Sequence, residues 1–189
     1  MAYKSSFAEH IVEDSAMNAT LRRRINELAN DILRLYGISI PIYDMRKVVD
    51  LMEGEVLEDV TLGAYSDGKV MKNKDSFSIF IPPNQPIVRE NFTIAHELGH
   101  LFLHMGYLIN KELWENSDAT VYNRKGSSET EMQANEFAAA FLMPQQEYKE
   151  IVDLNTEDNM VNISNVASHF NVSTEAASYR GKWLGYLQW

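Results

Sequence analysis

The stretch FTIAHELGHLFLHM, residues 92–105, decides how this chain folds. Apolar side chains occur all round it, and its only charged side chain besides the histidines is that of Glu97. Such a segment is typical of a helix that is buried on nearly all sides, and we expect this helix over residues 91–105. A carboxylate inside it is costly unless a partner or a cation compensates its charge. The core is therefore expected to form around this helix, with a polar site at Glu97.

Within this helix, the run His96-Glu97-Leu98-Gly99-His100 has the pattern H-E-x-x-H. Residues four apart lie on one face of a helix, about one turn from each other, so the two imidazoles can bind one tetrahedral ion. Glu97 projects beside that face, where it can take a proton from a water molecule that the ion activates. A chain with five histidines would contain this pattern by chance in about one case in a hundred. The motif therefore predicts a metal site with a general base.

A third ligand has to come from another part of the chain. His104 follows His100 by four residues, but it lies eight residues from His96, roughly 12 Å along the helix axis, which is too far for all three to bind one ion. The longer pattern HExxHxxGxxH is not present, since Leu103 and Gly106 occupy its last two fixed positions. We expect His104 to support the site or to pack in the core.

Glu131 is the best carboxylate for the third position, and its alternative is a helix cap. A helix is predicted over residues 128–143, and its alanines at 138–140 would let it pack closely on the first helix near Gly99, as a shared ion requires. Ser128 and Glu131 also form the pattern S-x-x-E, in which Glu131 would bond the backbone of Ser128 instead. The residues alone give these two interpretations equal weight. Lesser ligand candidates among the nearby carboxylates are Glu129 and Glu136.

The rest of the chain shows few strands and several separate helices, which is typical of an α+β fold. Periodicity and capping signals predict further helices over residues 19–36, 41–52, 163–170 and 174–184, and short β segments over 56–71 and 76–82. We expect a long connection over residues 108–125 and loose order in the first 18 residues. The chain is interpreted as one domain, residues 1–189, with a small, mostly antiparallel sheet. The strand 76–82 has even odds of lying at a sheet edge, where an extended peptide could pair with it.

Composition and charge exclude several classes of protein. The chain of 189 residues has no cysteine, which excludes disulfides, thiol catalysis and zinc sites built on cysteine, and agrees with a cytoplasmic protein. It has no apolar run long enough to cross a membrane, and its first residues do not resemble a signal peptide. Its net charge of −10 argues against direct binding of nucleic acid.

Residues 161–184 nevertheless resemble a helix-turn-helix, with Ser173 as the cap of its second helix. A helix that reads DNA carries basic and polar side chains, and this one offers Arg180 and Lys182 but also Glu175. These three are the only charged side chains from residue 161 onward, apart from His169. We therefore expect a helical pair that packs on the core rather than a module that reads DNA.

Two stretches together resemble the ImmA/IrrE family of metallopeptidases. They are FTIAHELGHLFLH, residues 92–104, and ETEMQANEFAAAFLMP, residues 129–144. In that family a HELGH helix is followed by a helix with the pattern E-x-x-A-N-x-F-A-A-x-L-L-M-P, whose opening glutamate is the third zinc ligand. The resemblance therefore implies a zincin-like fold and favours Glu131 as the ligand. Phe141 departs mildly from the pattern, because leucine is commoner there.

What the resemblance implies is a zinc-dependent endopeptidase with a narrow choice of substrate. His96, His100 and Glu131 would hold Zn²⁺, with Mn²⁺ or Fe²⁺ as less favoured ions, and Glu97 would act as the catalytic base. Family members of phages and mobile elements cleave helix-turn-helix repressors, and others act in stress responses, so the expected partner is a DNA-binding repressor. The alternative is a non-catalytic regulatory or toxin–antitoxin protein with a structural metal site, which would have no need of Glu97.

Two general features of the sequence point to the same selectivity. Beyond the ligand helices and the small sheet, little of the chain remains to form deep pockets, so we expect a shallow site that takes its binding energy from remote contacts with one partner. The net charge of −10 would steer a basic repressor towards it. Tyr122 or Tyr179 could donate a hydrogen bond to the oxyanion of the reaction, but the sequence selects neither.

Overall fold

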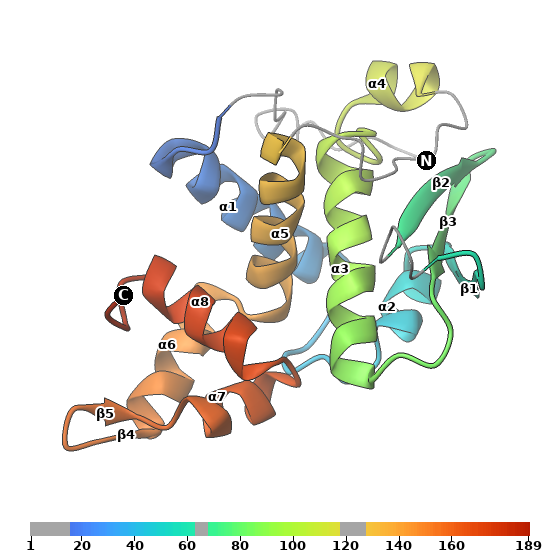
Figure 1. Cartoon of the computed structure of the whole chain (residues 1–189). Helices are drawn as coiled ribbons and strands as arrows, with labels where there is room; N and C mark the ends of the chain where they lie inside the picture. Colours follow the sequence, from blue (N-terminus) through green and yellow to red (C-terminus); the bar gives the residue numbers. More distant parts are fainter. Residues whose placement is uncertain (1–15, 63–67, 118–127) are drawn as a thin grey trace.

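The computed structural model describes residues 16–62, 68–117 and 128–189, with side chains of the helix that starts at 128 described from 129 onward. Helix α3 (Ile87–Leu103) stands at the centre, with α5 (Ser128–Leu142) on one side and a three-stranded sheet on the other (Figure 1). This mixture of helices with small sheets confirms the α+β prediction. None of the helices in the described part of the chain has the length and apolar character of a membrane span. The remaining elements are α1 (Ala19–Tyr36), α2 (Met45–Leu51), β1 (Glu55–Glu58), β2 (Lys69–Asn73), β3 (Ser76–Ile81), α4 (Lys111–Asn116), α6 (Gln145–Leu154), β4 (Thr156–Glu157), β5 (Met160–Val161), α7 (Ile163–Phe170) and α8 (Thr174–Trp183).

Helix α1 has the boundaries that the sequence predicts. The side chain of Asn18 accepts the backbone N–H of Leu21 and caps its start. The helix ends at Gly37, whose φ of 61° lies in the left-handed region that glycine adopts without strain. The expectation of loose order falls mainly on residues 1–15, which lie outside the described residues. Met17 is fixed in place, because its backbone N–H donates to Glu129 Oε2 at 3.0 Å.

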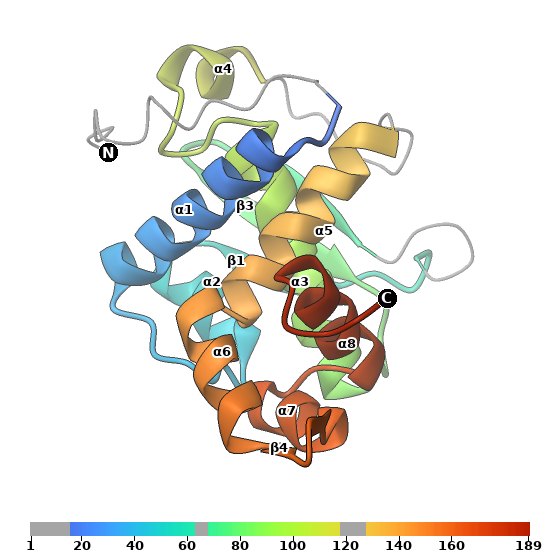
Figure 2. The same cartoon turned by 90° about the vertical axis from the view of Figure 1, so that its left-hand side faces the viewer.

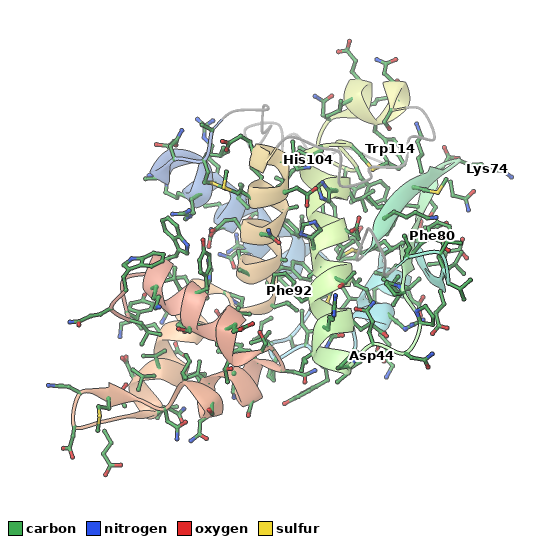
Figure 3. The ribbon with its side chains drawn as sticks, in the orientation of Figure 1. Asp44, Lys74, Phe80, Phe92, His104 and Trp114 are labelled. Carbon is green, nitrogen blue, oxygen red and sulfur yellow. The ribbon has the colours of Figure 1, made fainter. Side chains whose placement is uncertain are left out.

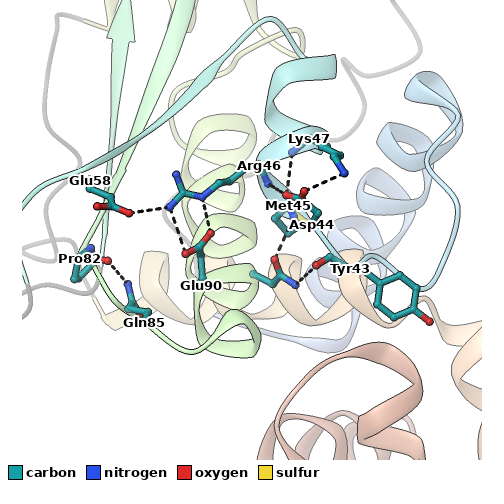
Figure 4. Close-up of polar contacts among 10 residues, drawn as sticks. Tyr43, Asp44, Met45, Arg46, Lys47, Glu58, Pro82, Gln85 and Glu90 are labelled. Carbon is teal, nitrogen blue, oxygen red and sulfur yellow. Dashed lines mark hydrogen bonds and ion pairs between the residues drawn. The ribbon is translucent and has the colours of Figure 1, made fainter.

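Helix α2 is shorter than predicted, because Asp44 accepts the backbone N–H of Arg46 and sets the start of the helix at Met45. Two polar contacts hold α2 against the first turns of α3 (Figure 4). Arg46 Nε donates to Glu90 Oε1 at 2.6 Å, and the buried Asn91 accepts the backbone N–H of Met45 at 3.1 Å. These contacts fix the orientation of α3, which carries the two histidines of the motif.

The sheet has the order β1-β3-β2, with β1 parallel and β2 antiparallel to the central strand β3. The predicted strand 76–82 is present, and of its two alternatives the structure shows the covered strand and not the sheet edge. Ile79 pairs with Val56 of β1 on one side and with Val70 of β2 on the other, so β3 has no edge to offer a peptide. Strand β2 is an outer strand of this sheet and contacts α3. The separate hairpin β4-β5 is antiparallel, so most pairings in the described strands are antiparallel as predicted.

Helices α3 and α5 approach closely where they carry the candidate site, and α1 covers another side of α5 (Figure 2). A Cβ atom on Gly99 would lie 2.9 Å from the Cα of Ala134, so only glycine fits at this crossing. The sequence predicts close packing near Gly99 through the alanines at 138–140. The structure confirms the close packing but places the contact one turn earlier in α5, at Ala134.

The C-terminal part contains more structure than the sequence predicts, namely α6 and the hairpin β4-β5. Helices α7 and α8 lie where the helix-turn-helix pattern places them, and Ser173 caps α8 by accepting the backbone N–H of Ala176. Arg180, the residue best suited by type to contact DNA, is only 2% exposed and faces α5. The prediction that this helical pair packs on the core is therefore confirmed.

A buried polar cluster ties α8 to α5 and α1. Arg180 Nη1 donates to Glu136 Oε1 at 3.1 Å, and its Nη2 donates to Asn26 Oδ1 at 2.7 Å. Glu136 also accepts from Arg22 Nε at 3.0 Å and from Asn26 Nδ2 at 2.7 Å. One carboxylate thus serves two guanidinium groups, and this use removes Glu136 from the list of candidate metal ligands.

We expect Glu136→Ala to lower the free energy of unfolding by about 3–5 kcal/mol, because it leaves Arg180 buried without its carboxylate. Urea unfolding followed by circular dichroism measures this loss. The double variant Glu136→Ala/Arg180→Met removes both charges and should recover part of it. The exposed Glu150→Ala is the matched control and should change stability by less than about 0.5 kcal/mol. Equal stability of Glu136→Ala and Glu150→Ala would contradict the importance of this cluster.

Candidate metal centre

His96 and His100 on α3 and Glu131 on α5 converge on one point, and each offers a ligand atom within 4.8 Å of the other two. The Nε2 atoms of the two histidines are 3.0 Å apart. Glu131 Oε2 lies 3.3 Å from His96 Nε2, and Oε1 lies 3.4 Å from His100 Nε2. The carboxylate therefore faces the histidines, as the ligand interpretation of Glu131 requires and the helix-cap interpretation does not. Figure 3 shows the labelled Phe92 and His104, which flank this pair along α3, on the side towards α5.

The tautomer of His96 is set by Asn135, one turn after Glu131 on α5. His96 Nδ1 lies 2.9 Å from Asn135 Oδ1, and an amide oxygen only accepts. Nδ1 therefore carries the proton, and Nε2 presents its lone pair to the site. Asn135 belongs to the family pattern, but the sequence alone does not indicate that it contacts His96.

A second chain of hydrogen bonds sets the tautomer of His100. Gln133 Oε1 accepts from His104 Nε2 at 3.0 Å, which leaves His104 Nδ1 as an acceptor for His100 Nδ1, also at 3.0 Å. His100 Nε2 therefore also turns its lone pair to the site. Burial lowers the pKa of His104 to about 4, and the neighbouring His100 adds to this effect, so His104 stays neutral at physiological pH. His104 thus supports the imidazole of His100, in agreement with one of the two roles predicted for it.

The electrostatics of the three groups favour a cation between them. Burial works to lower the pKa of His96, but the carboxylates of Glu131 and Glu97 outweigh it and hold that pKa above its ordinary value. In turn, His100 and His96 hold the pKa of Glu131 well below its usual range. Two lone pairs and a carboxylate that face one another at 3.0–3.4 Å repel unless a positive charge lies among them. This donor set of two imidazoles and one carboxylate fits Zn²⁺.

Glu97 directly follows His96 in α3 and is buried, with only 3% of its surface exposed. Its carboxylate lies against Thr93 and the start of β2: a Cβ atom on Gly68 would lie 2.7 Å from Glu97 Oε1. The missing side chain of Gly68 is thus what leaves room for the carboxylate between helix and sheet. The sequence predicts Glu97 as the base, but nothing in the sequence pattern indicates Gly68.

The other candidates from the sequence do not join this group. Glu129 holds the backbone of Met17, and Glu136 holds two arginines. Tyr122 lies outside the described residues, and Tyr179 lies on α8.

A cavity of about 630 Å³ opens beside the metal centre, between α1, α5 and α8. Asn135, which holds His96, is part of its wall, and so is Phe92, one turn before His96 on α3. The wall of the cavity contains none of the three proposed ligands, so the expectation of a shallow site at the metal stays a prediction.

Comparison with known proteins agrees with this geometry. Residues 61–182 match the model of a peptidase family, Peptidase_M78, described as the IrrE N-terminal-like domain. No curated protein matches the chain significantly. Among solved structures, a protein titled "Mycobacterium tuberculosis transcriptional regulator" is similar with a TM-score of 0.55 and 17% identity, which indicates a shared fold. The match covers 93% of this chain and 49% of that chain, so this chain spans about half the length of that protein.

Proposed function

Because the chain belongs to the family of IrrE N-terminal-like domains, a metallopeptidase family, we propose that it is a zinc-dependent endopeptidase that cuts one partner protein. The observation that carries this proposal is the convergence of His96, His100 and Glu131 with the buried Glu97 beside them. A site that only stabilises the fold needs ligands but no base. The catalytic role of the four residues is part of this proposal.

The proposed roles follow from where each side chain lies. Bound Zn²⁺ supplies a Lewis acid that polarises the scissile carbonyl and lowers the pKa of water to about 7. Asn135 and His104 orient the two imidazoles, so that both Nε2 atoms are held ready as ligands. Glu97 takes the proton of the attacking water on its carboxylate and passes it to the leaving amine. Zn²⁺ suits the two imidazoles best, while Mn²⁺ and Fe²⁺ also occupy sites of this composition.

The outer strand β2 offers a way to place an extended peptide across the site. Gly68, directly before β2, lies against Glu97, so a substrate strand paired with β2 would run past the carboxylate. Backbone pairing of this kind is independent of sequence. The choice of substrate must then come from side-chain contacts elsewhere on the protein.

We propose a DNA-binding repressor as this partner, in the cytoplasm, on two grounds. One is the family resemblance, and the other is the net charge of −10, which attracts a basic protein. The solved structure with the similar fold is itself titled a transcriptional regulator. Direct contact of this chain with nucleic acid is not part of the proposal.

Selective cleavage tests the proposed function. We expect the zinc-loaded protein to cut a helix-turn-helix repressor, where one is encoded beside its gene, at few positions, and to leave casein nearly intact. The rate should fall as ionic strength rises, because salt screens the steering of a basic substrate. Mass spectrometry of digests at two salt concentrations measures both effects. Broad digestion of casein with no effect of salt would contradict the selectivity, and an intact repressor and casein would contradict the peptidase.

A further inference from the structure

The cavity beside the metal centre is bordered by apolar side chains that remain open to solvent. Met132 is 44% exposed, Tyr179 56% and Trp183 39%. Figures 1 and 2 show α8 near α5, and side chains of α8 line one side of the cavity. Its volume of about 630 Å³ lies in the range of binding sites for small ligands or short peptide segments, about 300–1,000 Å³. The residues that give it its apolar character are Met17, Phe92, Met132, Ala176, Tyr179 and Trp183.

The cavity shares residues with the metal centre. Asn135 lines it and also holds His96 at 2.9 Å, and Met132 follows the ligand Glu131 in α5. A substrate whose scissile bond lies at the metal therefore has its neighbouring residues within reach of the cavity. Because the cavity lies so near the candidate metal centre, it is a candidate binding site for part of the substrate.

The charges of the cavity are unevenly distributed. At its base, the guanidinium groups of Arg22 and Arg180 share Glu136, and Arg22 is also covered by the ring of Trp183 at 3.5 Å. At its mouth, Glu175 is exposed in the first turn of α8, and Glu129 accepts the neutral backbone N–H of Met17. The mouth therefore favours a cation, whereas the walls favour an apolar side chain.

We propose that this cavity recognises a segment of the substrate in which a large apolar side chain is flanked by Lys or Arg. The apolar side chain packs between Phe92, Tyr179 and Trp183, and the flanking cation pairs with Glu175 and Glu129. This inference rests on the proposed function for its identification of the occupant as substrate. It assigns selectivity to α8, because the pairing with β2 does not distinguish side chains.

Direct peptide binding tests the cavity without any need for cleavage. The host is the Glu97→Gln variant, so that no peptide is consumed, and the probes are three fluorescein-labelled Gly/Ser decapeptides. The first carries Arg-Phe-Arg at its centre, the second Glu-Phe-Glu and the third Arg-Ala-Arg. Fluorescence anisotropy should show at least ~10-fold tighter binding of the first than of either other peptide. Equal binding of the three peptides, or no binding of any, would overturn the proposal.

Substitutions inside and outside the cavity then show where the peptide binds. Ala176→Phe fills the cavity and should weaken binding of the Arg-Phe-Arg peptide at least ~10-fold, whereas Ser168→Phe, on the exposed face of α7, should not change it. Glu175→Lys should reduce the preference for arginine over glutamate. Tyr179→Ala removes an exposed ring and serves if Ala176→Phe does not fold, which thermal melting shows. Unchanged binding in both Ala176→Phe and Tyr179→Ala would place the peptide elsewhere.

The outcomes separate this inference from the proposed function. If the peptides bind with the expected preference but the zinc-loaded protein cuts nothing, the cavity is a recognition site and the peptidase proposal fails. If the repressor is cut but Ala176→Phe cuts it with unchanged KM and kcat, the peptidase stands and the cavity is not its recognition site. A rise in KM with little change in kcat is the expected result, because the cavity contributes binding and no chemistry.

Discussion

Glu97→Gln is expected to leave the metal content unchanged and to slow cleavage of the substrate by at least ~100-fold. Glutamine keeps the shape of the side chain and its ability to accept a hydrogen bond, but it cannot take up a proton at neutral pH. It therefore still fits the narrow space that Gly68 and Thr93 leave for it. Elemental analysis and the initial rate of repressor cleavage measure the two quantities on the same preparation.

The matched control is Glu27→Gln, because Glu27 is an exposed glutamate in α1, outside the site and the cavity. It should cleave at the rate of the unmodified protein. A Glu97→Gln variant as active as this control would rule out Glu97 as the base. A Glu97→Gln variant that loses its metal would show instead that the carboxylate helps to hold the site together.

The comparison of the sequence with the structure shows which features are encoded locally. His96 and His100 are predictable because four residues span one helical turn whatever the rest of the fold does. Helix α1 is predictable to the residue, because its cap Asn18 and its stop at Gly37 directly flank the helix in the sequence. The start of the short α2 is encoded locally too, by its cap Asp44, although its predicted start at residue 41 is too early.

Glu131 is a different case, because its local pattern supports two answers. The sequence Ser128-Glu129-Thr130-Glu131 is a good capping box, and only the resemblance to a family favours the ligand. The structure brings the carboxylate to the histidines through the contact of Gly99 with Ala134. Local propensity therefore does not decide where the carboxylate of Glu131 lies, and the packing of two helices does.

What the sequence does not show depends on contacts between distant segments. Gln133 of α5 accepts a hydrogen bond from His104 at the end of α3, and Gly68, next to β2, packs against Glu97. Neither the hydrophobic periodicity nor a motif of the sequence indicates these contacts of Gly68 and Gln133. The same holds for Arg180, whose burial against Glu136 turns a candidate DNA contact into part of the core. Each of these pairs is separated by more than 25 residues in the chain.

The largest effect on the metal is expected from changes at its three proposed ligands. His96→Ala, His100→Ala and Glu131→Ala should each lower the affinity for Zn²⁺ by more than ~100-fold, because two remaining protein ligands do not complete a tetrahedral site. His104→Ala and Glu129→Ala should retain the metal through gel filtration. His104→Ala should still show roughly 10–100-fold weaker binding in competition with a chelator, because it frees the imidazole of His100 to turn.

The variant Glu131→Gln tests most directly whether the carboxylate of Glu131 is the third metal ligand. The amide can donate to one of the two Nε2 atoms that the carboxylate faces, so the protein without metal should be at least as stable as the unmodified one. Zn²⁺ should raise the Tm of the unmodified protein by mass action and leave that of Glu131→Gln nearly unchanged. Glu129→Gln, two residues earlier on the same helix, is the control and should respond to Zn²⁺ like the unmodified protein. A normal metal response in Glu131→Gln would show that the third ligand lies elsewhere, and full metal in Glu131→Ala would return this glutamate to its role as a helix cap.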